Sequence, residues 1–200
     1  GAYELWRAAV DSGVKPIIGI EAYVTPETAR QDKTRVSWDT NWTPVPGHAR
    51  NPDDVSGGGL ITHLTMWAEN DEGLVNLIKA SSVANLEGRV MRYPRMDKEV
   101  LSTYSKGVIA SSGCPSGIIQ TRLRLGQFDE ALRAAGEFQD IFGKDNFYIE
   151  LMDHGLSIES KVTGDLLTIA KKLGAPLLAT NDSHYVMEAD KDAQDAMLCI

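Results

Sequence analysis

Five residues of types that bind metal ions occur within or directly after predicted strands: Glu21, His63, Cys114, Asp182 and His184. A mixture of imidazole, carboxylate and thiolate suits zinc, manganese or iron better than magnesium. Glu21 interrupts an apolar segment, where an unpaired carboxylate is costly unless a cation or strong hydrogen-bond donors compensate its charge. These residues therefore predict bound divalent metal ions, with zinc or manganese preferred and iron the third choice.

Each of these residues also has an ordinary structural explanation that the sequence leaves open. Glu21 can reach solvent from a strand end, and His63 can be a hydrogen-bonded core histidine. Cys114 can act as a small, half-buried hydrophobic residue at a turn. Asp182 can cap the next helix, with His184 merely beside it. The metal interpretation rests on the joint occurrence of these residues at four separate strand ends.

Asp182 and His184 are two residues apart, so on an extended backbone both side chains point the same way and can share one ion. We assign them ligand roles first, with proton transfer as a further catalytic role. Glu150 and His154 follow another strand and are candidates for orienting the ligands, or for a purely structural role. His48 lies in a proline-rich segment and is expected to be exposed to solvent.

Strand and helix patterns alternate along the chain, and they must position these side chains. The predicted strands are residues 16–24, 60–67, 107–111, 146–151 and 176–180, and the predicted helices are residues 2–12, 71–85, 116–125, 128–142, 158–173 and one beginning near residue 188. Ser157 is a plausible N-cap, and Gly13 and Gly174 are plausible helix ends. This order predicts an α/β fold with a parallel sheet and helical crossovers, either open or closed as a barrel. In such folds the ends of the strands converge at one edge, so the five residues can meet there.

The composition sets limits on fold and partners. Two hundred residues with 42% hydrophobic content predict one domain, residues 1–200, in which residues 25–59 form a loop or hairpin insertion without periodicity. A net charge of −8 argues against a broad basic face for nucleic acid. Three arginines, Arg95, Arg122 and Arg124, are either phosphate contacts or ordinary solubilising charges. The two cysteines lie far apart, which argues against a disulfide framework and a zinc ribbon.

The sequence shows no sign of a membrane segment or a signal peptide. No stretch approaches the roughly 18 consecutive apolar residues of a membrane span, so we expect a soluble, cytoplasmic chain without a membrane partner. The chain begins at Gly1 without a methionine and is already inside an amphipathic pattern. We therefore expect the natural N-terminus to lie upstream or to have been removed.

Four segments closely resemble the PHP (polymerase and histidinol phosphatase) domain of bacterial DNA polymerase III alpha subunits. They are KPIIGIEAYV at 15–24, THLT at 62–65 with NDEGL at 70–74, SGCP at 112–115, and ATNDSHY at 179–185. The tract at residues 54–57 is actinobacterial in style. The resemblance covers essentially the whole chain. It implies a distorted (β/α)7 barrel, similar to a TIM barrel, with a trinuclear metal cluster at its C-terminal mouth.

Carried over position by position, the family's ligands would include Glu21, His63, Cys114, Asp182 and His184. The family also uses a His-x-His motif and further His and Asp ligands, which its layout places before Gly1. We therefore expect a fold that is incomplete at its N-terminus and a cluster that holds fewer ions, more weakly.

The resemblance implies metal-dependent hydrolysis of a phosphodiester at a DNA 3′ end, which is 3′–5′ proofreading within a replicative polymerase. The implied partners are the DNA 3′ end, the remaining polymerase domains of the same chain and replisome subunits such as the sliding clamp. Two alternatives stay open. One is a non-catalytic PHP domain that stabilises the polymerase or docks a separate exonuclease. The other is a phosphomonoesterase similar to histidinol phosphatase.

Overall fold

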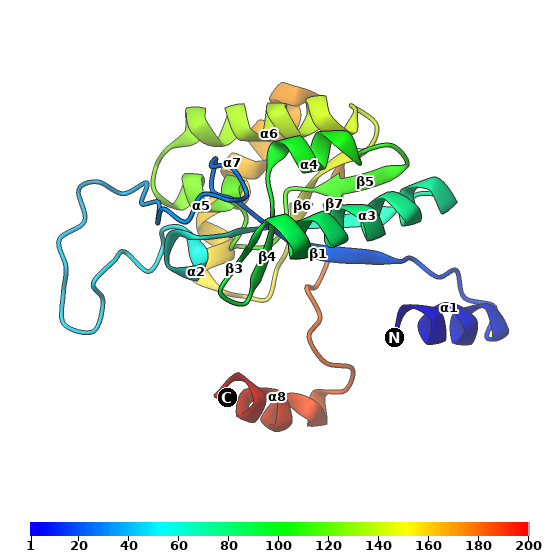
Figure 1. Cartoon of the computed structure of the whole chain (residues 1–200). Helices are drawn as coiled ribbons and strands as arrows, with labels where there is room; N and C mark the ends of the chain where they lie inside the picture. Colours follow the sequence, from blue (N-terminus) through cyan, green and yellow to red (C-terminus); the bar gives the residue numbers. More distant parts are fainter. Residues whose placement is uncertain (200) are drawn as a thin grey trace.

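The computed structural model describes residues 1–199, which form a body of sheet and helices with one helix standing apart at each end (Figure 1). Helix α1 (Ala2–Asp11) precedes the body and helix α8 (Lys191–Leu198) follows it. Neither helix contains a buried residue. The core and the candidate site therefore lie in the body between them.

The body is built on a seven-stranded sheet in the order β3-β4-β1-β2-β5-β6-β7. Its strands are β1 (Gly19–Val24), β2 (Thr62–Ala68), β3 (Arg89–Val90), β4 (Tyr93–Met96), β5 (Val108–Ser111), β6 (Phe147–Leu151) and β7 (Leu177–Ala179). Strand β1 pairs with β4 in parallel, and β5, β6 and β7 are parallel to one another. The expected mixed α/β class is confirmed, but an all-parallel sheet is wrong: β2 is antiparallel to both β1 and β5, and β3 is antiparallel to β4.

The direction of β2 follows from its connection to β1. Between the two strands the chain forms only one short helix, α2 (Ser56–Gly59), in which Gly57 and Gly58 have positive φ. Antiparallel neighbours need no crossover helix, so the chain returns beside β1 from the edge at which β1 ended. Strand β2 consequently begins where β1 finishes.

The sequence patterns missed β3, β4 and α4 (Lys98–Thr103), which fill the segment between α3 and β5. Strand β4 contains Pro94 and Arg95, residue types that weaken a strand pattern. The Arg95 side chain is fully buried and donates hydrogen bonds to the carbonyl oxygens of Arg30 and Asp32, at 2.6 and 2.7 Å. A buried arginine that donates hydrogen bonds to another backbone segment stands where the strand pattern predicts an apolar residue.

The longer helices agree with the predicted ranges within a few residues. They are α3 (Asp71–Glu87), α5 (Ile118–Arg124), α6 (Phe128–Phe142) and α7 (Ser157–Leu173), and the 3-10 helix η1 (Glu188–Asp190) precedes α8. Gly174 ends α7 in the left-handed conformation, as predicted. Ser157 is the first helical residue instead of the N-cap; Leu156 takes that position without a side-chain cap.

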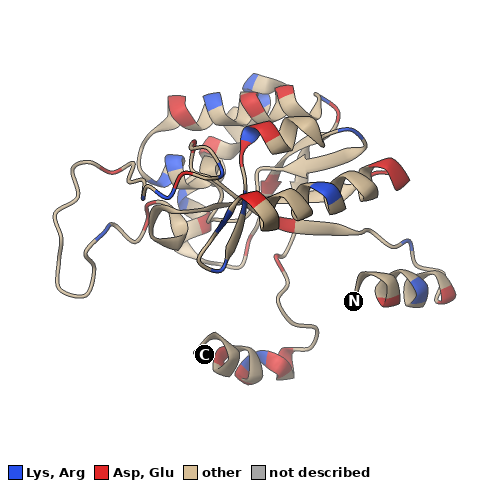
Figure 2. Cartoon of the chain, in the orientation of Figure 1, with Lys and Arg blue, Asp and Glu red and all other residues tan. Residues whose placement is uncertain are grey.

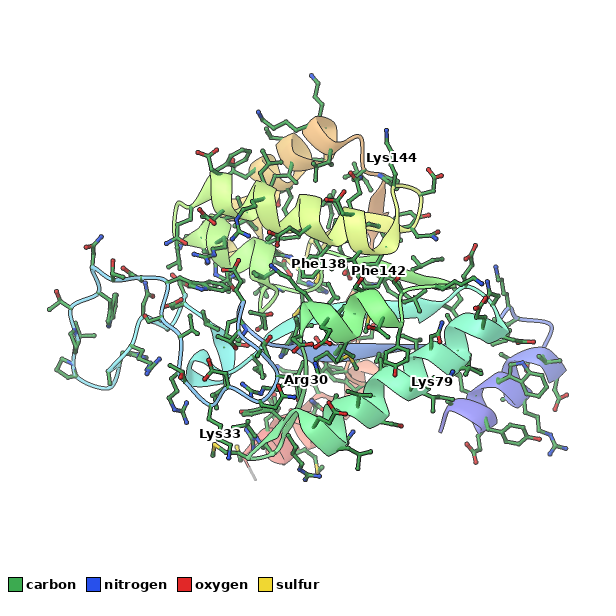
Figure 3. The ribbon with its side chains drawn as sticks, turned by 45° about the horizontal axis from the view of Figure 1, so that its top comes forward. Arg30, Lys33, Lys79, Phe138, Phe142 and Lys144 are labelled. Carbon is green, nitrogen blue, oxygen red and sulfur yellow. The ribbon has the colours of Figure 1, made fainter. Side chains whose placement is uncertain are left out.

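The long helices of the body pack against one face of the sheet around the main hydrophobic core, and Leu60, Ile61 and Val90 form a second, small cluster. Phe138 and Phe142 of α6 belong to the main core, and Figure 3 labels both. The rings of Phe138 and Phe147 lie 6.0 Å apart, and burial of each such side chain stabilises the fold by about 1.5–3 kcal/mol. Since strand residues alternate between faces, the second face carries the half-buried or exposed neighbours of the core residues, including Glu21 and His63.

The segment of residues 25–59 is mostly irregular and projects from the body at the left of Figure 1. Ionic contacts hold its start: Arg30 binds Asp97, with Nη1 3.1 Å from Oδ2, and Glu27 accepts hydrogen bonds from Arg122 and Arg133. Burial acts to raise the pKa of Glu27, but the two arginines outweigh it and hold that pKa below its ordinary value. These contacts fix the start of the segment to the body of the domain.

None of the helices within residues 1–199 combines the length and the apolar character that crossing a membrane requires.

Candidate metal centre

Three of the five predicted ligands meet at one point on the second face of the sheet. His63 Nδ1 lies 2.9 Å from Glu21 Oε1, and Cys114 Sγ lies 3.4 Å from that nitrogen and 3.5 Å from the same oxygen. Their ligand atoms all lie within 4.8 Å of one another. Side chains separated by as many as 93 positions in the sequence thus form one polar group, in which Cys114 is buried, His63 half-buried and Glu21 the most exposed.

The antiparallel pairing of β1 and β2 brings the first two side chains together. Tyr23 lies opposite His63 and Glu21 lies opposite Thr65, so His63 is the diagonal neighbour of Glu21 on the same face. Diagonal neighbours in a sheet are within reach of long side chains. His63 therefore reaches the site from the beginning of β2 and not from the carboxyl end of a strand, where loops of parallel strands converge.

The turn after β5 supplies the cysteine. The backbone N–H of His63 donates to the carbonyl of Ser116 at 3.0 Å, and His63 forms an isolated parallel bridge with Gly117. Gly113 has φ +78°, and a side chain there would press on the backbone of His63. A glycine is thus required for the close approach that places Cys114 over the start of β2.

Hydrogen bonding and burial shift the ionisation of this group in opposite directions. The hydrogen bond with His63 holds the pKa of Glu21 below its usual value, against burial, which acts to raise it. Burial raises the pKa of the Cys114 thiol to about 12. Without a cation the group therefore contains a carboxylate and a neutral thiol, and a metal ion must displace the thiol proton in order to bind.

The geometry fits a small divalent ion. Donors at typical zinc distances in a tetrahedral site lie about 3.3 Å apart for nitrogen and oxygen, and about 3.6 Å apart when one donor is sulfur. The three observed separations lie within about half an ångström of these values. A thiolate, an imidazole and a carboxylate together are a donor set of the kind that holds zinc. The group can hold a metal ion with three protein ligands and an open position.

Asp182 and His184 lie close by but outside this group. His184 Nδ1 is 2.7 Å from the backbone oxygen of Asp182 and 4.0 Å from its carboxylate. Asp182 has φ +45°, so the prediction of an extended backbone at Asp182 and His184 is wrong. That extended backbone was the reason for expecting the two side chains to share an ion. Both residues line a cavity of about 450 Å³ that also touches Pro115, next to Cys114.

His154 and Glu150 hold the loops around that cavity. His154 lies with Nδ1 2.6 Å from Glu159 Oε1 and Nε2 2.9 Å from the backbone oxygen of Asn181. The hydrogen bond with Glu159 raises the pKa of His154. Glu150 is buried and accepts hydrogen bonds from the hydroxyls of Ser111 and Thr180, which joins the ends of β5, β6 and β7. Neither residue is part of the Glu21–His63–Cys114 group.

The remaining candidates separate clearly. His48 is exposed, as predicted. Arg95 is engaged with backbone carbonyls, and Arg122 stacks on Trp38 with its guanidinium carbon 3.8 Å from the ring centre, so both side chains are buried against partners within the domain. Arg124 borders a second cavity. The hydrogen bonds that Glu150 makes between strand ends were not predicted. A carboxylate in an apolar strand is nevertheless a signal at Glu150, as it is at Glu21.

Fold and site together define an α/β domain with a candidate metal centre on one face of its sheet. The chain belongs to the PHP domain family, whose sequence model, described as "PHP domain", matches residues 1–154.

Several curated relatives resemble the chain along all 200 residues. It is 48% identical to DNA polymerase III subunit alpha of Mycobacterium leprae and 50% identical to the protein of that name from Saccharopolyspora erythraea. The corresponding Borreliella burgdorferi protein is 38% identical. The chain spans only 16% of the length of the Mycobacterium leprae relative and 17% of the Saccharopolyspora erythraea relative.

Proposed function

We propose that this chain is a metal-dependent phosphoesterase domain within a bacterial DNA polymerase III alpha subunit, acting on a phosphodiester at a DNA 3′ end. The observation that carries the proposal is the convergence of Glu21, His63 and Cys114 within 4.8 Å. Relatives that bear the polymerase name match the whole chain and support the substrate class. In this proposal the activity is 3′–5′ proofreading during replication in the cytoplasm.

We propose zinc as the first choice of metal, with manganese and iron next, because the group includes a thiol. A divalent cation held by these residues would neutralise charge at phosphorus and would lower the pKa of a water molecule. The contact between Glu21 and His63 holds their two metal-binding atoms close to each other. Cys114 contributes a soft ligand once its proton leaves.

Asp182 and His184 are proposed as further ligands and as residues that can pass protons. They border a cavity whose volume of about 450 Å³ lies in the range of small-ligand sites. The electrostatic influence of His184 on Glu21 and of Asp182 on Cys114 supports their placement near the centre.

The wider arrangement belongs to the same proposal. Residues 1–200 would form the larger part of a PHP domain with an insertion at residues 25–59, and its sheet would be the wall of a distorted (β/α)7 barrel. The remaining polymerase domains and replisome subunits such as the sliding clamp would be its partners.

Metal content and hydrolysis together test the proposal, and the histidines provide matched variants. His63→Ala and His184→Ala remove proposed ligands, whereas His48→Ala removes an exposed histidine of the insertion. We expect bound metal, measured by mass spectrometry after gel filtration, to fall at least tenfold in His63→Ala and to stay unchanged in His48→Ala.

Hydrolysis of single-stranded DNA from its 3′ end should follow the metal content. Activity on a small phosphomonoester without activity on DNA would favour a phosphatase like histidinol phosphatase, and no activity on either would favour the non-catalytic scaffold. Equal metal content and activity in the His184→Ala variant and the unmodified protein would remove His184 from the site.

A further inference from the structure

A second cavity, of about 320 Å³, lies beside the candidate metal centre and shares Pro115 with the first. One side of it is formed by the end of the 25–59 segment, and the other by the turn that carries Cys114 and by α5. Its polar lining includes Arg50, Arg124 and Ser116. Cys114, Pro115 and Ser116 are consecutive, so the lining of this cavity begins one residue after Cys114.

Arg124 is a buried cation whose hydrogen bonds go to uncharged groups. Only 5% of its side chain is exposed. Its terminal nitrogens donate to the backbone oxygens of Pro115 and Asp53 and to the hydroxyl of Thr121. Its Nε has no hydrogen-bond partner, and the nearest carboxylate oxygen, of Asp53, lies 3.7 Å away. A buried charge bound mainly to neutral acceptors is stabilised further by an anion.

The surroundings add positive charge to the same wall. Arg50 is exposed, and one of its nitrogens lies 3.3 Å from the backbone oxygen of Val36. Asp54, the carboxylate in the lining, already accepts hydrogen bonds from Ser37 and from loop amides. Figure 2 shows blue residues gathered where the loop meets α5, in a chain whose net charge is −8.

We propose that this cavity binds a backbone phosphate of single-stranded DNA, adjacent to the phosphodiester that occupies the first cavity. The inference rests on the proposed function for its substrate class. Arginine suits phosphate because its planar group offers several donors at once. Because Pro115 borders both cavities, a strand that runs across it places consecutive phosphates at Arg50 and Arg124 in the second cavity and beside Asp182 and His184 in the first.

Binding measured without metal tests this assignment separately from hydrolysis. The probe is a fluorescent single-stranded oligonucleotide, titrated with the whole protein in EDTA at several salt concentrations and followed by anisotropy. Each phosphate contact on single strands contributes about 0.7 to the slope of log Kobs against log salt concentration. We expect Arg50→Gln to weaken binding and to reduce that slope by about 0.7.

Lys144→Gln is the matched control, because it also removes one exposed positive charge. Lys144 lies between α6 and β6, and Figure 3 shows it on the opposite side of the body from the projecting loop. Arg124→Lys and Arg124→Gln extend the test, with thermal unfolding as a check, because Arg124 also supports the Cys114 turn. Arg50 is exposed, so its replacement should leave folding intact.

The outcomes distinguish the two proposals. A slope that falls in Arg50→Gln and stays unchanged in Lys144→Gln supports the cavity, even if the protein hydrolyses no DNA. Equal slopes and affinities in both variants, or no binding of the oligonucleotide at all, would overturn it, even if the metal centre proves active.

Discussion

Replacement of Asp54 by asparagine should loosen the 25–59 segment without affecting the rest of the core. The Asp54 carboxylate is buried and accepts hydrogen bonds from Ser37 Oγ at 2.7 Å, from the backbone N–H of Trp38 at 3.0 Å and of Asp39 at 3.2 Å, and from its neighbour Val55 at 2.7 Å. This one side chain therefore closes the loop that presents Arg50 to the second cavity.

The magnitude follows from counting the donors. An asparagine oxygen can accept about two of the four hydrogen bonds, and each buried donor left without a partner costs about 1–3 kcal/mol. Ser37 is exposed and can turn to water. With Ser37 hydrated, about one buried donor is left without a partner, so we expect the segment to lose about 1–3 kcal/mol of local stability. This raises the equilibrium constant for opening of the loop by roughly 5- to 140-fold.

Hydrogen exchange measured by NMR at the amides of Trp38, Asp39 and Val55 reports this local stability. The control is Asp140→Asn, an exposed position on α6, where we expect a change within about 0.5 kcal/mol. Amide protection at Trp38 that stays within about threefold of the unmodified protein would refute the reasoning, since a threefold change corresponds to less than about 0.7 kcal/mol.

The same carboxylate predicts a pH dependence. Burial acts to raise the pKa of Asp54, but hydrogen bonds from Ser37 and the loop amides outweigh it and hold that pKa below the ordinary value of 3.8. A group whose pKa is lowered by folding stabilises the fold above its ordinary pKa, and this stabilisation is lost as the pH falls through the lowered value. The protection of Trp38 should therefore decrease below about pH 4 in the unmodified protein and change less in Asp54→Asn.

Two further substitutions or reactions test the packing and the site. Gly73→Ala should destabilise the protein by about 1–3 kcal/mol, because the added methyl group would overlap the carbonyl oxygen of Gly107. Gly164→Ala should stabilise α7 by about 0.5–1 kcal/mol, because the space around Gly164 is open. Melting temperatures that shift in the same direction in both variants would contradict this. At pH 8 the Cys114 thiol, with its pKa raised to about 12 by burial, should react with iodoacetamide far more slowly than the exposed Cys199; comparable rates in the folded protein, measured by peptide mass spectrometry, would contradict the burial of Cys114.

The sequence by itself determined most of the elements that are strongly periodic. Helix α6 spans the predicted residues 128–142, and the glycine that ends α7 was predicted from its position. Local signals suffice there, because an amphipathic repeat and a cap depend on neighbours within a few residues. The ligand types at Glu21, His63 and Cys114 were also visible in the sequence, since carboxylate, imidazole and thiol stand out within or just after apolar strands.

Only the tertiary structure decided how those ligands meet. The alternation of strands and helices predicts parallel strands, whereas β2 runs antiparallel and its second residue, His63, lies diagonal to Glu21. Strand β4 was not predicted, because a buried arginine that donates hydrogen bonds to distant carbonyls has no local pattern. Strand direction and long-range hydrogen bonds depend on contacts between segments far apart in the chain, and residue spacing along one segment carries no record of them.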